Sequence, residues 1–247
     1  ALTSALLELM EEKQNKVYLL TGHGEPAHHT PDLSTFKAFL ERQNLKLDAL
    51  NLNNAESIPA DASALILIAP KTDLSERDLK LLADYWNERN GRLLFLVGGN
   101  VKTPRLAQWL ETLGLTLNQD VVVKMGTMLA LEEGKPVLRN GIVTNATGFL
   151  PPQSKPILKD LSEMDIQLAG MSQSMEVDPA KIRAIQLIAT TADFWGETEY
   201  VAAAAQPAAK DPQKDHLGPL TLGVALEHGA LQDPRMKVET GRMVLIG

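Results

Sequence analysis

The sequence has no cysteine, few aromatic residues and no long apolar run. The lack of cysteine excludes disulfides, thiolate metal sites and a cysteine nucleophile. No apolar run approaches the roughly 18 residues that span a bilayer, and no basic and apolar leader opens the chain, so nothing in it crosses or targets a membrane. Its formal charge of −7 is spread evenly, with no basic cluster interleaved with aromatic residues. Nucleic acid is therefore not an expected partner.

What is present is the composition of a globular protein with a sizeable core: 44% hydrophobic and 22% charged residues. The ends are unusual. The chain begins at Ala1 without a methionine and stops at the apolar run 241–247, whereas chain ends are commonly polar and loosely held. We expect a piece of a longer, membrane-anchored protein whose flanks hold the membrane segments.

Apolar runs alternate with helical patterns in the first half. Strands are expected at 16–21, 47–52, 64–69, 92–97 and 120–124, and helices at 2–12, 30–44 with Thr30 as N-cap, 75–90 with a Ser75 capping box, and 104–113 with Gly114 after it. The run ALILIA at 64–69 is apolar without alternation, as in a parallel strand covered on both faces. This order predicts an α/β fold, a three-layer sandwich with a mostly parallel central sheet, flavodoxin-like or class I glutamine amidotransferase-like.

The second half is less regular and richer in strands. A hairpin is expected from 127–131 and 136–139, a loop at 151–156, strands at 184–189, 220–227 and 242–246, and an exposed connection at 202–205 and 208–216. No break in composition divides the chain. We therefore expect residues 1–247 to form a single elaborated α/β domain.

A dense polar cluster follows the first expected strand. Its candidate ligand-binding or partner-binding residues are Thr21, Gly22, His23, Gly24 and Glu25. Ligands of open α/β sheets bind beyond the carboxyl ends of the strands, and two glycines let a backbone approach closely. The G-x-G lacks the third glycine of a dinucleotide fingerprint and the G-K-[ST] of a P-loop, which disfavours nucleotides.

Two other interpretations of this loop stay open. His23, Glu25, His28 and His29 are possible metal ligands, but Pro26 breaks the register and no known ligand spacing is present. The simpler interpretation is a structural loop whose side chains bond to backbone. We expect no metal and no cofactor.

A second polar constellation, 190–198, also follows an expected strand. If that strand lies in the same sheet, Trp195 and Glu197 approach the His23 loop and complete the candidate site; otherwise Trp195 is a packing anchor. The chain has no G-x-S-x-G elbow, and Ser172-Gln173-Ser174 has no histidine nearby in sequence. We therefore expect no catalytic residue and no enzymatic activity.

Several segments together resemble one family. They are KVYLLTGHGE at 16–25, LILIAPKTDLSERDLKLLADYWNERNGRLLFLV at 65–97, LAQWLETLGLTLNQDVVV at 106–123, TTADFWGET at 190–198, DHLGPLTLGVALEHG at 215–229 and GRMVLIG at 241–247. In this order they resemble the soluble region of GldG-like proteins, auxiliary components of ABC-type transport systems known from gliding-motility gene sets. The resemblance implies an extracytoplasmic, periplasmic domain tethered by helices outside this chain, working beside an ABC permease and its ATPase, with room for another extracytoplasmic partner.

Two functions remain in view. The first is a non-enzymatic auxiliary domain with a binding or scaffolding role in transport. The second is a small-molecule or sugar-binding sensor, or an enzyme, that uses His23 and Glu25. A deep pocket at the His23 loop would favour the second function.

Overall fold

The computed structural model describes residues 15–27, 29–99, 101–132, 135–144, 146–158, 166–168, 171–201, 210–228 and 240–247. The expected helix at 2–12 and the expected loop at 202–205 lie outside these residues. The chain divides into two compact units. Unit 1 comprises Ala1–Leu96, Thr103–Trp109 and Leu226–Leu245, and unit 2 comprises Val97–Lys102, Leu110–Ala225 and Ile246–Gly247.

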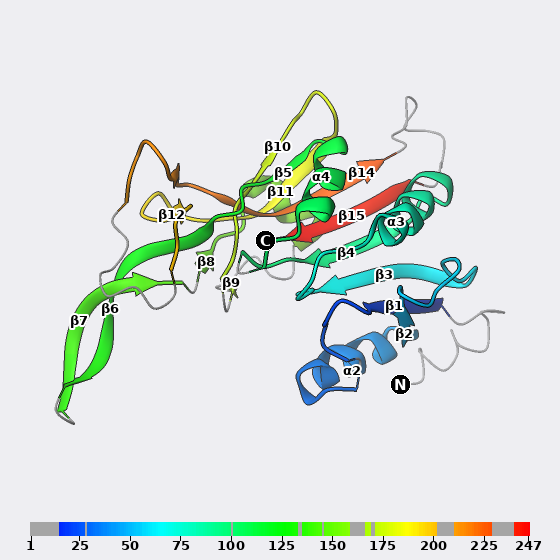
Figure 1. The fold of residues 1–247 in the computed structure, drawn as a ribbon, viewed down its shortest axis with the longest axis horizontal. Helices are drawn as coiled ribbons and strands as arrows, with labels where there is room; N and C mark the ends of the chain where they lie inside the picture. The colour runs from blue at the N-terminus through cyan, green and yellow to red at the C-terminus, as the bar shows by residue number, and fades with distance from the viewer. Residues whose placement is uncertain are drawn as a thin grey trace. The chain divides into compact units, whose positions relative to one another are not determined.

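Unit 1 is built on a largely parallel sheet (Figure 1). Its strands are β1 (Asn15–Thr21), β2 (Leu45–Asn51), β3 (Ala62–Ile68), β4 (Arg92–Leu96) and β15 (Gly241–Ile246), in the order β2-β1-β3-β4-β15. β1 runs parallel to both β2 and β3, and β3 runs parallel to β4. β15 begins beside the start of β4, where the Arg242 N–H donates to the Gly91 carbonyl at 3.0 Å. The parallel arrangement expected for the first four strands is confirmed.

The helices of unit 1 follow the expected order. They are the 3₁₀ turn η1 (Pro31–Leu33), α2 (Ser34–Arg42), α3 (Glu76–Glu88) and the start of α4 (Pro104–Thr112). The Ser75 capping box of α3 is present in full. Thr30 is the N-cap residue, as predicted, and it precedes the 3₁₀ turn η1; its hydroxyl forms no cap hydrogen bond and donates back to the Ala27 carbonyl at 2.9 Å.

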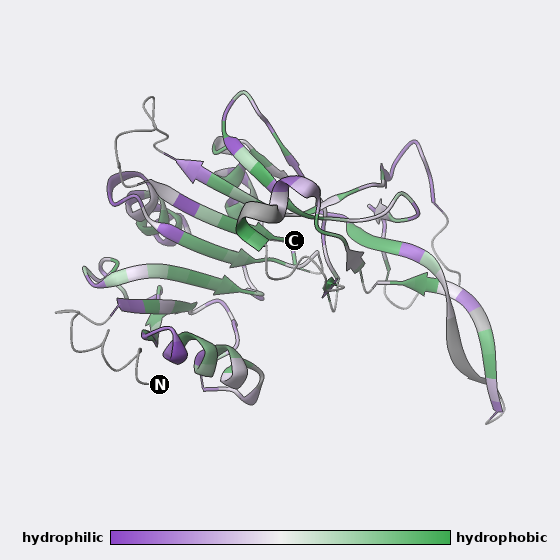
Figure 2. Cartoon of the chain, turned by 180° about the vertical axis from the view of Figure 1, so that it is seen from behind, coloured by the Kyte–Doolittle hydropathy of each residue, from purple (hydrophilic) through white to green (hydrophobic). Residues whose placement is uncertain are grey.

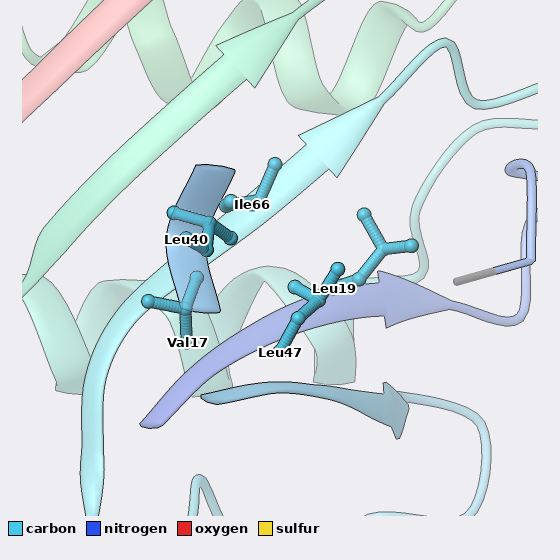
Figure 3. Close-up of a cluster of buried hydrophobic side chains, with 5 residues drawn as sticks. All are labelled: Val17, Leu19, Leu40, Leu47 and Ile66. Carbon is cyan, nitrogen blue, oxygen red and sulfur yellow. The ribbon is translucent and has the colours of Figure 1, made fainter. Parts of the chain in front are cut away.

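Helices cover both faces of this sheet. One face carries a buried cluster in which Leu40 of α2 packs with strand residues (Figure 3). The strand members of the cluster are Val17, Leu19, Leu47 and Ile66, with the partly buried Leu94 against them. Phe95, the next residue along β4, therefore points to the opposite face. There its ring lies 6.1 Å from the ring of Trp109 in α4.

β3 supplies the centre of this core. Leu65 and Leu67 are fully buried and Ile66 nearly so, and Figure 2 shows the hydrophobic colour along most of the strand. A strand with apolar side chains on both faces needs cover on both. The expected three-layer α/β sandwich is confirmed.

Unit 2 is rich in antiparallel strands. One group contains β5 (Leu115–Leu117), β10 (Met175–Val177), β11 (Arg183–Ala189) and β14 (Thr221–His228), where β10 pairs antiparallel with both β5 and β14, and β11 also pairs with β14. A second sheet has the order β13-β12-β6-β7, with β6 (Val121–Glu132), β7 (Lys135–Val143), β12 (Trp195–Glu197) and β13 (His216–Leu217). β8 (Ala146–Gly148) and β9 (Ile166–Leu168) form a separate antiparallel pair.

Two segments of unit 2 differ from expectation. The expected strand 120–124 and the expected hairpin are one long hairpin, β6–β7. The expected loop at 151–156 contains the 3₁₀ turn η2 (Pro152–Ser154) and the start of α5 (Lys155–Leu158). A turn forms there because Pro152 needs no N–H partner at its first position, and because the Ser154 hydroxyl donates to the Pro151 carbonyl at 2.6 Å. No helix within the described ranges is long and apolar enough to span a membrane.

Candidate functional site

The loop after β1 is fixed by two glycines with left-handed backbone. Gly22 has φ of 123° and Gly24 has φ of 84°, a region that favours glycine. The Gly22 carbonyl accepts from Asn53 Nδ2 at 2.8 Å. A Cβ on Gly24 would lie 2.9 Å from the Cβ of Lys71. Residues that carry a side chain therefore do not fit at positions 22 and 24.

The polar side chains of the loop point inward. Glu25 Oε2 accepts from the backbone N–H of His23 at 2.7 Å, and Glu25 Oε1 lies 3.4 Å from His23 Nδ1. His23 Nε2 lies 3.2 Å from Asp78 Oδ2. The side chains of His23, Glu25 and Asp78 are 6%, 0% and 1% exposed. This arrangement places an imidazole between two buried carboxylates.

Asp78 also caps helix α3. Its Oδ2 accepts from the backbone N–H of Ser75 at 3.0 Å and from the Ser75 hydroxyl, and the Asp78 N–H donates back to Ser75 Oγ at 3.2 Å. One carboxylate thus joins the start of α3 to the loop after β1. The sequence indicated Asp78 only as the acid of the Ser75 capping box; the buried histidine that it contacts is 55 residues away, so no local pattern indicates the pair.

Trp195 and Glu197 lie in unit 2, whereas the His23 loop lies in unit 1. Trp195 packs against Val121 and Val123 of β6, and its indole N–H donates to Glu197 Oε2 at 3.2 Å. Both residues are buried, at 3% and 6% exposure. The W-G-E stretch is therefore part of the core of unit 2, and its approach to the His23 loop stays a prediction.

Unit 2 contains a polar cluster that the sequence did not indicate. Asp120, fully buried, accepts from the Ser174 N–H at 2.7 Å and from the Ser174 hydroxyl at 2.6 Å. His216 Nδ1 lies 3.0 Å from the same carboxylate. Gly196 packs so closely that a Cβ there would lie 1.7 Å from Asp120 Oδ2. Asp120 is thus the centre of the cluster.

This order of residues is not that of a serine hydrolase. In the Ser-His-Asp arrangement the histidine stands between the other two residues and takes the proton of the hydroxyl. Here the carboxylate stands between Ser174 and His216, so the hydroxyl is not activated by the imidazole. Across the described ranges, no three or more His, Asp or Glu side chains gather in a way that holds a metal ion; His28, one of the metal candidates, lies outside those ranges.

The chain matches a known protein family. A family model described as ABC-type uncharacterized transport system matches residues 14–247. No curated protein matches the sequence significantly.

Solved structures resemble the chain in fold at low identity. The mmIFT52 N-terminal domain aligns with a TM-score of 0.57 and 13% identity, over 94% of this chain and 85% of that one. A putative ThuA-like protein from Parabacteroides merdae gives 0.45 and 13%, over 95% and 79%. Isoenzyme 2 of α-L-fucosidase from Paenibacillus thiaminolyticus gives 0.43 and 14%, over 84% and 28%. The first of these likenesses supports the α/β fold.

Proposed function

Because this chain belongs to the family described as an ABC-type uncharacterized transport system, we propose that it is a non-enzymatic binding or scaffolding domain of such a system. Membership makes it an auxiliary component of ABC-type transport. The resemblance of its TGHGE and W-G-E-T stretches to GldG-like proteins supports the finer proposal: an extracytoplasmic domain that works beside the ABC permease and its ATPase, in a system of the gliding-motility type.

The observation that carries the scaffolding role is the β6–β7 hairpin. It projects from the rest of unit 2 (Figure 1) and exposes large apolar side chains. Met125 is 51% exposed and Leu138 is 72% exposed. Met125 and Leu138 lie on the same face of the hairpin. Met125 is directly opposite Ile142, and residues opposite each other in a ladder share a face. Leu138 is an even number of residues from Ile142 on the same strand, so it shares that face too.

A two-stranded ribbon is marginally stable alone in water, and large apolar side chains exposed on one face of it are candidates for an interaction site. The partner that we propose for this hairpin is another subunit of the same transport system. The contact would bury Met125 and Leu138 and stabilise the hairpin.

The test uses the intact transport system in its native membrane. Leu138→Asp is expected to weaken co-purification of the permease and ATPase by about thirtyfold or more, the size of an interface hot spot of about 2 kcal/mol. Phe39→Asp is the matched control, since Phe39 is also exposed (56%) but lies on α2 of unit 1. Equal recovery of the subunits with both variants would contradict the proposal.

The absence of enzymatic activity is tested separately. The chain has neither a P-loop nor an acidic Mg²⁺ partner for it, so the purified protein is expected to hydrolyse ATP no faster than background. ATP hydrolysis above background would overturn the scaffolding proposal if a substitution in this chain abolishes it.

The alternative, a sensor or enzyme centred on His23 and Glu25, requires these side chains to meet a ligand. Their burial, the hydrogen bond from the His23 backbone N–H to Glu25 and the contact of His23 with Asp78 favour a structural role instead. The double variant His23→Ala/Glu25→Ala is therefore expected to lower the free energy of unfolding by about 1–3 kcal/mol for each buried group. A variant of unchanged stability that abolishes transport would instead favour the sensor or enzyme.

A further inference from the structure

A small cavity of unit 1 gathers positive charge. It lies where β3, β4 and β15 begin and α3 ends, and its volume is about 340 Å³, at the lower end of the range of small-molecule sites. Arg89, Arg92 and Arg242 line it, and no Asp or Glu is among its described lining residues. In a chain of net charge −7, this local excess of cations indicates an anionic ligand.

Arg92 and Arg242 are direct neighbours in the sheet. The Arg242 N–H donates to the Gly91 carbonyl at 3.0 Å. At the other end of the two strands, the Val97 N–H donates to the Ile246 carbonyl at 2.8 Å. This is the pattern of parallel strands in which residue 92 pairs with residue 242, so both side chains leave the same face of the sheet. Two like charges side by side repel each other unless an anion lies between them.

The protein itself neutralises only part of this charge. Glu227 Oε1 lies 3.5 Å from Arg242 Nε, which leaves both Nη groups of Arg242 for another partner. The same Glu227 oxygen accepts from the Thr240 hydroxyl at 2.7 Å. The Arg92 guanidinium has no hydrogen bond or ion pair with any residue that the structure describes. Its donors are therefore available to a ligand.

Arg89 is held in place beside them. Its guanidinium donates to the carbonyls of Ile58 and Pro59, both at 3.0 Å, and lies 5.0 Å from the centre of the Tyr85 ring. The Arg92 N–H donates to the hydroxyl oxygen of the same tyrosine at 3.5 Å. Burial raises the pKa of Tyr85 above its ordinary 10.0, whereas the charges of Arg89 and Arg92 act in the opposite direction. Both cations thus lie close to one phenol.

The charges and the donors favour a phosphate over a carboxylate. Three arginines and the neighbouring Glu227 sum to +2 (3 − 1), and Asp61, next in sequence to the lining residue at 62, is paired with Lys16 at 2.6 Å. A phosphate monoester carries about −1.5 to −2 near neutral pH, whereas a carboxylate carries a single charge. Guanidinium groups match phosphate oxygens in pairs. The walls also offer the neutral polar groups of Ser63, Asn90 and Thr240.

We propose that this cavity binds a phosphate monoester group, with its oxygens between the guanidinium groups of Arg92 and Arg242 and the fixed charge of Arg89 beside it. Soluble phosphate compounds and the lipid phosphatidic acid both present this group. The proposal does not depend on the scaffolding role, because the cavity lies in unit 1 and the β6–β7 hairpin lies in unit 2.

The first test titrates the intact chain with inorganic phosphate and with acetate in calorimetry, at low ionic strength, where charge interactions are least screened. Saturable binding of phosphate is expected, with acetate at least about tenfold weaker because it carries less charge and fewer acceptor oxygens. Equal binding of acetate and phosphate, or no saturable binding of phosphate, would overturn the proposal.

Variants locate the phosphate in the cavity. Arg92→Gln and Arg242→Gln are each expected to weaken phosphate binding about tenfold. Arg183→Gln is the matched control, since Arg183, like Arg92, is the exposed first residue of a strand, but it belongs to β11 of unit 2. Equal weakening by all three variants would place the ion on the surface in general and contradict the site.

NMR of the unaltered protein tests the same point if a variant does not fold. Phosphate is expected to shift the ¹⁵N resonances of the Arg92 and Arg242 Nε–H groups and to leave that of Arg183 in place. The reverse pattern would overturn the proposal.

A vesicle assay identifies the source of the phosphate. Phosphatidylcholine vesicles with and without phosphatidic acid are sedimented with the intact chain. Retention that requires phosphatidic acid, and that Arg92→Gln removes, would support the site with a lipid headgroup as its ligand. Phosphate binding without such retention would support the site with a soluble ligand. Retention that Arg92→Gln and Arg242→Gln leave unchanged would contradict a role of the cavity in lipid binding.

Discussion

Replacing Asp78 by alanine removes two supports of unit 1 at once. The carboxylate caps α3 through Ser75 and contacts His23 Nε2 at 3.2 Å. Loss of such a cap costs about 1 kcal/mol. A buried imidazole nitrogen left without a partner costs about 1–3 kcal/mol more. The expected decrease in the free energy of unfolding is therefore about 2–4 kcal/mol.

The same helix supplies the control for this prediction. Asp84 forms an exposed pair with Lys80 at 2.6 Å, and exposed i,i+4 pairs contribute little to stability. Asp84→Ala makes the same chemical change without burial, so its effect is expected to be several times smaller. Urea unfolding followed by circular dichroism measures both.

A further measurement locates the effect of Asp78→Ala. Amide hydrogen exchange is expected to accelerate in the first turn of α3 and in the loop at 22–25, because Asp78 joins these two segments. Equal unfolding free energies for Asp78→Ala and Asp84→Ala, or unchanged exchange at both segments, would refute the reasoning that the buried carboxylate connects them.

Two other predictions each rest on a single contact. Gly196→Ala would place a Cβ 1.7 Å from Asp120 Oδ2 and is expected to destabilise the protein by about 3 kcal/mol or more in thermal unfolding. The control is Gly241→Ala, whose Cβ would have ordinary contacts at 3.4 Å or more, and which is expected to change stability by less than about 1 kcal/mol. Similar melting temperatures for the two variants would contradict the clash. Burial, and then the hydrogen bond to Asp61, raise the pKa of Tyr18 above its ordinary 10.0. Asp61→Asn is therefore expected to lower that pKa without restoring it fully, as measured by the ultraviolet absorbance of tyrosinate against a Tyr18→Phe variant. An unchanged titration would show that Asp61 has no part in the shift.

The sequence predicted the regular part of unit 1 because its signals are local. The runs that became β1, β3 and β4 are apolar and end at glycine or proline, and the Ser75 capping box is contained in four residues. Such patterns record burial and capping directly. The single-domain expectation stays a prediction beside the two compact units.

The candidate sites were harder to predict from the sequence because the residues that meet in them are far apart along the chain. The position of His23 after a strand was visible, but its contact with Asp78 spans 55 residues and that of His216 with Asp120 spans 96. β12 and β13 have three and two residues, too few to show a period of two. The polar pattern at 190–198 therefore could not reveal that Trp195 begins a buried strand.

The return of the chain to unit 1 affects the order in which the protein can fold during synthesis. β4 ends at Leu96, but its neighbour β15 ends at Ile246, 150 residues later (246 − 96). At about 5–20 residues per second, a ribosome needs about 8–30 s to supply that neighbour. During this interval one edge of β4 has no partner, and open edges of apolar strands invite pairing with other chains. We expect nascent chains that stop before residue 240 to depend on chaperones, while unit 2 completes most of its own pairings before the sheet of unit 1 closes.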